Sequence, residues 1–475
     1  MQIKILELVV VIIYFLAMVG IGWHYRGKQT EESFWVANRS VGAFVNGMAI
    51  FATIGSAATF MGFISVGYSL GVTASLATIA GGALGYAFAA VGFAAPLRKF
   101  GKFTLGDFLS TRYETRSLKL ITAILTVVFF FAYLIPQLKG GGLVLQFLTG
   151  LPYWQGVVLG GLVFIIYVTM GGMLAITWTD FIQGVVAWCT MSILTIVIFA
   201  QFGGVGNMLQ AATAADPGFA ISKLPFWSVF GYVLSIALFM GASPHVVMRQ
   251  FTAKTPHAGR MSVVIAMIAM DFFALIWFSA LIAGGKVYFP NLADPDNLVL
   301  YVAGQYLPPL LLGLLAAGIL AAVQSTTDAM LLAIGASISH DIYRGGFKPD
   351  ATSEQVFKVG KIAMVLVGVA AILLTLKPPG LIGVIVGLIT GGIGASFFFP
   401  LWMGIWWKRA SKWGGITGVL GGFIVFLVVQ FGKLAPNFMG AVIGALTSLV
   451  LIVVVSLLTS PPSDKTVEMV SSLRD

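Results

Sequence analysis

The sequence predicts an all-α membrane protein that crosses the bilayer about thirteen times. Of its 475 residues, 59% are hydrophobic and only 9% are charged, and the mean hydropathy is +0.98. Apolar stretches of roughly 20 residues follow one another with short links, and each is long enough to cross a hydrocarbon core of about 30 Å. This composition excludes a soluble globular protein and makes lipid the surroundings of most of the chain.

The expected spans follow in chain order. The first, residues 5–24, is too long for a secretory signal and has no small-residue cleavage site after it, so we interpret it as a membrane helix. The remaining spans lie near residues 41–69, 73–95, 119–148, 153–171, 175–202, 226–248, 261–285, 305–339, 357–376, 380–406, 413–431 and 437–459.

The loops between the spans differ in charge. The net charge of +10 comes mostly from basic residues in every second loop, such as Arg249, Lys254 and Arg260 after the seventh span. Such loops face the cytoplasm, so we expect the N-terminus outside and the tail inside, in the plasma membrane of a bacterium. The basic residues never interleave with aromatic residues in a polar domain, which argues against a nucleic-acid partner.

Two spans are interrupted near their middle, at Gly55-Ser56 in the second and at Ser243-Pro244 in the seventh. Paired interruptions in corresponding helices are typical of inverted repeats that bind a solute between them. We therefore expect a peripheral helix and loop at 1–39, repeats at 40–202 and 226–406, and two peripheral helices with a tail at 407–475. Two unrelated kinks are the alternative.

One face of the ninth span suits a sodium ion. Ala322, Ser325 and Thr326 lie on the same face of a helix, at i, i+3 and i+4. Sodium prefers hard oxygen ligands, and carbonyls freed where the second span unwinds, from Ala52 to Gly55, would complete an oxygen cage. Hydroxyls that bond back to their own helix are the alternative.

Four charged side chains lie well inside the spans, where each needs a partner or a function. Asp180 and Asp328 are a possible second cation site. Lys139, next to three glycines, either contacts a substrate carboxylate or pairs with Asp271 across the bundle.

The substrate site is expected where the two interruptions meet. Its predicted residues are Ser56, Thr59, Lys139 and Ser243. The chain contains no phosphate-binding loop, paired-histidine metal motif or nucleophile elbow, so we expect neither an enzyme nor a cofactor.

Several motifs together resemble the sodium:solute symporter family along nearly the whole chain. They are residues 104–108, residues 171–175 leading into Trp178-Thr179-Asp180, residues 244–249 and residues 321–326. The resemblance implies an inverted repeat of five plus five helices of the leucine-transporter type, with Na+ as the coupling ion.

The same resemblance implies residue roles. One sodium is held by the carbonyls of Ala52, Gly55 and Ala322 and by the hydroxyls of Ser325 and Thr326. Some members of the family hold another sodium through an aspartate that matches Asp180. In this chain Asp328 and Ala329 stand where hydroxyls are expected, which leaves the number of sodium ions open.

The substrate is a separate question, since one fold serves many ligands. Sugar carriers have glutamine near Thr59 and asparagine near Ser243, and proline carriers have aromatics where Ile236 and Met240 stand, so these residues disfavour both branches. Residues 133–137 resemble acetate and monocarboxylate carriers, and Lys377-Pro378-Pro379 resembles pantothenate carriers. We expect a monomer that imports a monocarboxylate such as acetate, lactate or pyruvate. Pantothenate, a proline-type amino acid and a passive channel are the alternatives.

Overall fold

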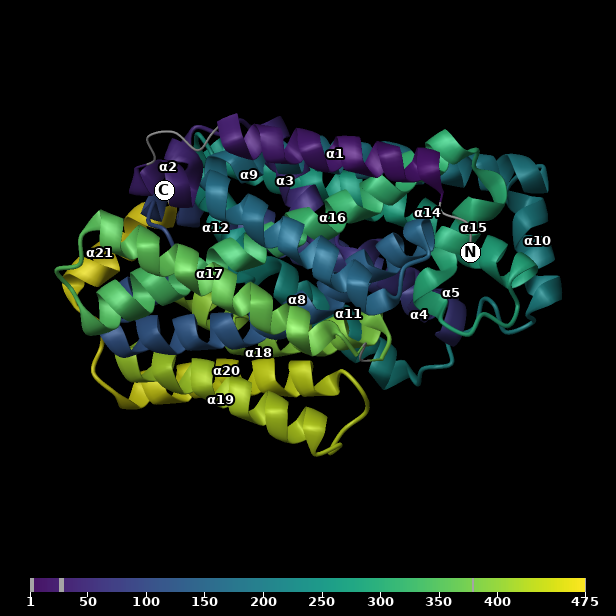
Figure 1. Ribbon diagram of the computed structural model, residues 1–475. Helices are drawn as coiled ribbons and strands as arrows, with labels where there is room; N and C mark the ends of the chain where they lie inside the picture. The colour runs from purple at the N-terminus through teal and green to yellow at the C-terminus, as the bar shows by residue number, and fades with distance from the viewer. Residues whose placement is uncertain (1–3, 25–29, 378–379, 475) are drawn as a thin grey trace.

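The computed structural model describes residues 4–24, 30–377 and 380–474. Within these ranges the regular elements are helices, with an isolated bridge between Val41 and Ala253. The long helices lie side by side along one direction, with α1 (Ile5–His24) at one edge of the bundle in Figure 1 and α19 (Lys412–Phe431) at the other. Pro378 and Pro379, which suggested a pantothenate carrier, lie outside the described residues.

The first half of the chain continues with α2 (Glu31–Val36), η1 (Ala37–Arg39), α3 (Ala43–Ile54), η2 (Ala58–Gly62), α4 (Phe63–Leu70), α5 (Val72–Phe88), η3 (Ala89–Phe93), α6 (Ala94–Phe100), α7 (Leu105–Arg112), α8 (Arg116–Thr149), α9 (Tyr153–Phe202) and α10 (Val205–Ala215). The second half forms α11 (Phe226–Ala242), α12 (Pro244–Thr252), α13 (Pro256–Met267), η4 (Ile268–Phe272), α14 (Phe273–Tyr288), η5 (Pro295–Asn297), α15 (Leu298–Tyr306), α16 (Pro309–Ala336), η6 (Ser337–Phe347), α17 (Ser353–Thr375), α18 (Ile382–Trp406), α20 (Met439–Leu458) and α21 (Asp464–Arg474).

The described part of the chain contains 11 helical stretches long and apolar enough to cross a membrane, or up to 12 when the bent pair Ala43–Ile54 and Ala58–Leu70 counts as one span. The expected span at 153–171 is the first part of α9, before the break at Gly172, and the stretch Tyr153–Ile166 within it is apolar. The count of thirteen is therefore not confirmed. At Gly172, inside α9, a φ of 61° and close approach to the Phe34 ring both favour glycine.

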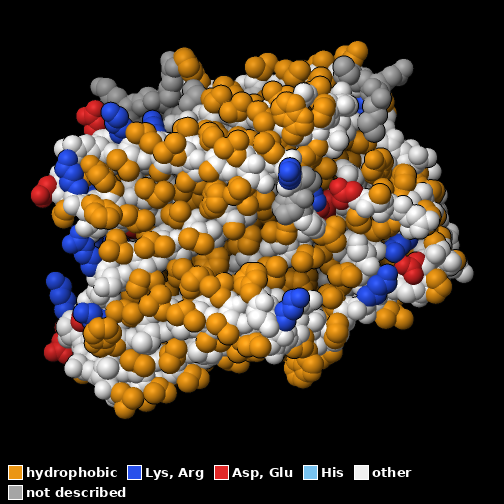
Figure 2. All heavy atoms as spheres, turned by 60° about the horizontal axis from the view of Figure 1, so that its bottom comes forward, with side chains coloured by type: hydrophobic (Ala, Val, Ile, Leu, Met, Phe, Trp, Pro, Cys, Tyr) orange, Lys and Arg blue, Asp and Glu red, His pale blue; other side chains and the backbone are white. Residues whose placement is uncertain are grey.

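The surface supports a membrane setting for this bundle. Figure 2 shows a broad band of hydrophobic side chains, with Lys, Arg, Asp and Glu gathered at the left edge and again in the right half. The chain ends lie at opposite ends of the bundle (Figure 1). The protein is thus a multi-pass membrane protein, and which end faces the cytoplasm stays a prediction.

Glycines let α19 pack closely on α18, and α20 on α19. A Cβ built at Gly422 would lie 2.2 Å from the carbonyl oxygen of Ala395, and one at Gly444 would lie 2.7 Å from the carbonyl oxygen of Gly422. Because both obstacles are backbone atoms, a larger residue requires the helices to separate.

We expect Gly422→Ala to lower the free energy of unfolding by about 1–3 kcal/mol, the typical effect of overpacking. Thermal unfolding of the detergent-purified protein measures this. Gly20→Ala in α1 is the matched control, because a Cβ there meets nothing within 4 Å. Equal stability of the two variants would show that α19 and α20 do not depend on this close contact.

Candidate sodium and substrate sites

The second expected span is broken, as predicted. α3 ends at Ile54, helical structure resumes at Ala58, and the two parts are bent by 60°. The N–H of Ala57, which would bond the Thr53 carbonyl in an unbroken helix, donates instead to Oε1 of Gln137 on α8 at 3.0 Å. Gln137 thus helps to hold the break open, a role that the sequence pattern did not assign to it.

The carbonyls at the end of α3 meet the two hydroxyls predicted on α16. Ser325 Oγ lies 2.7 Å from the Ala52 oxygen and 3.1 Å from the Ala322 oxygen. Thr326 Oγ1 lies 2.9 Å from the Thr53 oxygen and 3.0 Å from the Ala322 oxygen. Both hydroxyls therefore face the broken helix rather than lipid, and with the carbonyls they form a compact group of hard oxygen ligands.

The predicted sodium residues are largely brought together. Ala52, Ala322, Ser325 and Thr326 contribute to this oxygen group, and Gly55 lies at the bend, where its φ and ψ of −64° and 92° leave the helix. Thr53 also contributes a carbonyl, one of those from Ala52 to Gly55 that the unwound span was expected to set free. The sodium role of these residues stays a prediction.

Asp180 has an arginine partner, Arg249, which charge counting places among the basic residues of a cytoplasmic loop. Arg249 pairs with Asp180 and donates to Thr177 Oγ1 at 2.9 Å, and Thr53 Oγ1 donates to Asp180 Oδ2 at 3.2 Å. Both charged side chains are fully buried. The assignment of Arg249 to a cytoplasmic loop was therefore wrong, because the last turn of α12 lies inside the bundle.

The facing sides of α9 and α16 carry further buried polar groups. The Tyr14 hydroxyl of α1 accepts from Gln183 at 2.7 Å and donates to Gln324 at 2.7 Å. One turn beyond Gln324, Asp328 is fully buried, and neither of its oxygens has a hydrogen-bond partner within the described ranges. Arg249 thus pairs with Asp180 and not with Asp328, and a second cation at this place stays a prediction.

Lys139 does not pair with Asp271. Its ammonium lies 2.6 Å from Oδ2 of Asp296, in η5, and donates to the Gly380 oxygen at 3.1 Å. Asp296 also accepts from the Ser65 hydroxyl at 2.6 Å. The lysine therefore joins α8 to α4 and η5, and its positive charge is already matched by a buried carboxylate.

The other predicted substrate residues do not form one site. Ser56 accepts from the Ala58 N–H at 3.1 Å within the break of the second span. Ser243 lies at the second break, between α11 and α12, where its hydroxyl is 2.7 Å from Nδ1 of the buried His245. Thr59 lines a small inner cavity beside the first break.

This inner cavity lies between α3 and η2 on one side and α5, α11 and η4 on the other. Its lining residues are Ile54, Thr59, Phe63, Thr78, Ile79, Gly82, Ile236, Met240, Met270, Asp271, Ala274 and Phe278. The free space is about 20 Å³, enough for a water molecule rather than a solute. Its lining is apolar except for Thr59, Thr78 and the carboxylate of Asp271.

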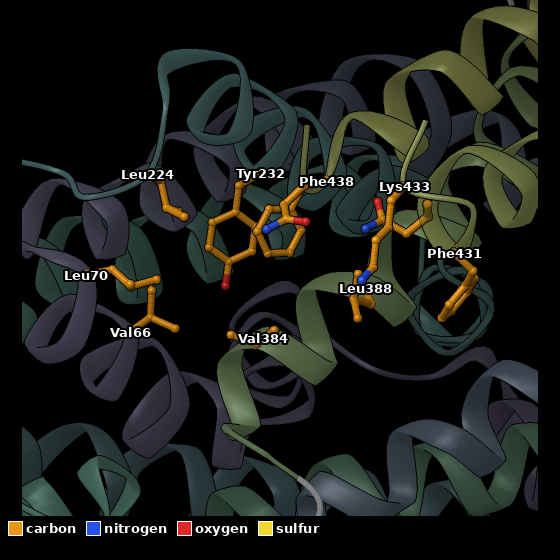
Figure 3. Close-up of a pocket in the computed structure, with 11 residues that line it drawn as sticks. Val66, Leu70, Leu224, Tyr232, Val384, Leu388, Phe431, Lys433 and Phe438 are labelled. Carbon is orange, nitrogen blue, oxygen red and sulfur yellow. The ribbon is translucent and has the colours of Figure 1, made fainter. Parts of the chain in front are cut away.

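A larger outer pocket of about 270 Å³ lies away from all predicted site residues. Figure 3 shows Leu70 and Leu224 at one side, Lys433 at the other, and Tyr232 with Phe438 between them. The rings of Tyr232 and Phe438 stack with centroids 4.4 Å apart. The loop between α19 and α20 therefore covers a space between α4, α11 and α18.

One group of residues has the composition of a metal site. The ligand atoms of Asp107, His340 and Asp341 lie within 4.8 Å of one another. The Lys119 ammonium, however, lies 2.8 Å from Asp107 and 3.4 Å from Asp341. Burial opposes the charged form of Asp107, but His340 and Lys119 together hold its pKa below the ordinary value. Lys119 thus supplies the positive charge that these carboxylates require.

Comparison with known proteins relates this chain to a family of membrane transporters. The profile of the sodium:solute symporter family matches residues 34–422. The high-affinity proline transporter PutP of Bacillus subtilis is 27% identical over 468 residues, which covers 95% of this chain and 98% of that protein. A sodium/proline symporter of Staphylococcus aureus is 28% identical over 437 residues, 88% of this chain and 85% of that protein.

Solved structures show the same fold. A Na+-coupled sialic acid symporter in a substrate-bound outward-open state superposes with a TM-score of 0.81 at 23% identity, covering 96% of this chain and 99% of that one. Mhp1, a nucleobase-cation-symport-1 family transporter, superposes with a TM-score of 0.52 at 16% identity, covering 94% and 99%.

Proposed function

Because the chain belongs to the sodium:solute symporter family, we propose that it imports a small amino acid of the proline type together with sodium. Sodium is the coupling ion of this family. The relatives named above are described as proline transporters and match most of this chain. None of them is described as a monocarboxylate carrier, so the expectation of acetate, lactate or pyruvate is not supported, and the proline-type alternative replaces it.

The observation that carries the sodium part of the proposal is the meeting of α3 and α16. Ser325 and Thr326 lie within hydrogen-bond distance of the carbonyls that the break in α3 sets free. Sodium bound among these oxygens would hold the two helices together. It would thereby favour the arrangement that binds the solute and raise solute affinity through ordinary linkage.

The overall organisation remains part of this proposal. Two repeats at 40–202 and 226–406 rock around the breaks at Gly55 and Ser243, in a protein that works as a monomer. The N-terminus is outside and the tail is in the cytoplasm.

We expect proteoliposomes that contain the purified protein to accumulate labelled proline above its external concentration when sodium is high outside. Collapse of the sodium gradient should reduce uptake to the level of empty liposomes, because accumulation takes its energy from the gradient. Acetate, lactate, pyruvate and pantothenate, tested in the same vesicles, should not accumulate.

Other results would identify another function. Sodium-driven accumulation of pantothenate or of a monocarboxylate without proline would replace the substrate assignment. Flux that never exceeds equilibrium and does not saturate would indicate a passive channel.

A further inference from the structure

The inner cavity contains a carboxylate whose role the proposed function leaves open. Asp271 is 9% exposed, and its Oδ2 is buried without a hydrogen-bond partner among the residues that the structure describes. A charged group inside the membrane is expensive, so it normally faces a cavity, an ion or a substrate. Asp271 faces a cavity next to the break in the second span.

The local backbone is arranged to present this side chain. Asp271 lies in η4, a short π-helical segment that interrupts the helix between α13 and α14. Such π-bulges are frequent at functional sites, because the additional residue turns a side chain out of the regular helical ladder. In this span the bulge coincides with the charged residue.

The opposite wall leaves room for the carboxylate. A Cβ on Gly82 of α5 would lie 2.5 Å from Asp271 Oδ1, so any larger residue would displace the carboxylate. Tyr86 follows Gly82 by one helical turn and therefore lies on the same side of α5. Its hydroxyl is also buried without a partner within the described ranges. A second buried polar group without a partner among the described residues therefore lies on α5, one helical turn from the glycine that faces Asp271.

The basic residues inside the bundle have other partners. Lys139 pairs with Asp296, and Arg249 pairs with Asp180. Within the described ranges neither Lys139 nor Arg249 is therefore available to Asp271, and its carboxylate is free to receive a cation that enters the cavity, as an ion or as part of a solute.

We propose that Asp271 binds the cationic nitrogen of the transported solute. This inference rests on the proposed function and specifies the feature that the solute must carry. A secondary ammonium such as that of proline has two N–H donors, and a carboxylate accepts both. The apolar ring of the solute would lie against Ile236, Met240 and Phe278, which line the same cavity. Since the free space is small, α4 and α11 must move apart before the solute enters.

The test compares proline with tetrahydrofuran-2-carboxylate, which keeps the ring and the carboxylate but has oxygen in place of the cationic nitrogen. Binding of each compound is measured as thermal stabilisation of the purified protein in saturating sodium. The wild type should bind proline about ten- to a hundredfold more tightly than the isostere, as expected for a charge-assisted hydrogen bond. Asp271→Asn should weaken proline binding by a similar factor and leave binding of the isostere unchanged.

Three further measurements show whether the loss of proline binding comes from the missing carboxylate charge. Stabilisation by sodium alone should persist in Asp271→Asn, which shows that the variant is folded. Asp271→Glu should retain part of the preference for proline, and Asp350→Asn, in an exposed loop, should behave as the wild type. An unchanged preference in Asp271→Asn overturns the inference alone. A wild type that prefers the isostere, pyruvate or lactate overturns both the inference and the proposed amino-acid substrate.

Discussion

Replacing Ser325 and Thr326 together by alanine is expected to abolish sodium-driven uptake. Each substitution removes a hydroxyl oxygen that lies within 3.1 Å of one carbonyl oxygen at the end of α3 and of the Ala322 carbonyl oxygen in α16. Interactions of a hydroxyl with a charged group contribute about 1.5–3 kcal/mol each. Loss of both should raise the sodium concentration for half-maximal uptake by at least about 100-fold, since 1.4 kcal/mol corresponds to a factor of ten.

The measurement is the initial rate of labelled proline uptake into proteoliposomes as a function of external sodium. Thr327→Ala is the matched control, because the Thr327 hydroxyl bonds back to the Val323 carbonyl at 2.7 Å instead of facing α3. Thermal unfolding shows whether the double variant is folded. If the folded double variant keeps the sodium dependence of the wild type, these two hydroxyls are not sodium ligands.

The features that could be predicted from sequence are local. The position of Gly55 and Ser56 in an apolar run predicted a break, and the spacing of Ser325 and Thr326 predicted a shared face. Both depend on residues within one or two turns of each other, where helix geometry fixes the outcome. Their meeting across the bundle required the additional assumption that the broken helix faces α16.

The buried ion pairs could not be predicted, because they join distant parts of the chain. Asp296 lies in a segment that hydropathy assigns to a loop, yet it is fully buried beside Lys139. Arg249 follows an apolar run and was counted with the cytoplasmic charges, although it is fully buried against Asp180. Charge counting treats every residue near a span end as a loop residue, so it misses side chains that turn inward.

Arg249→Met is expected to lower the free energy of unfolding by about 3–5 kcal/mol, because it leaves the buried Asp180 without its cation. Methionine retains an apolar stem of similar length, so the loss comes from charge more than from packing. Asp328 adds a second buried carboxylate on α16, and Gln183 and Gln324, which bond to Tyr14, are neutral. Thermal unfolding in detergent, at a fixed sodium concentration, measures the effect.

A second substitution distinguishes charge from packing. Arg249→Met combined with Asp180→Asn should recover most of the lost stability, since removing both members of a buried pair is far less harmful than removing one. Arg260→Met, at an exposed position on α13, should stay within about 0.5 kcal/mol of the wild type. If Arg249→Met is no less stable than Arg260→Met, the pair does not stabilise the bundle.

Sodium adds an independent test of the second cation position. Without the arginine, Asp180 and Asp328 offer two carboxylates to an ion, and an ion that binds only the folded protein raises stability with its concentration. Sodium should therefore stabilise Arg249→Met more strongly than the wild type, whereas the bulkier choline cation at the same ionic strength should not. Equal stabilisation of both proteins by sodium would restrict the bound ion to the group formed by Ala52, Ser325 and Thr326.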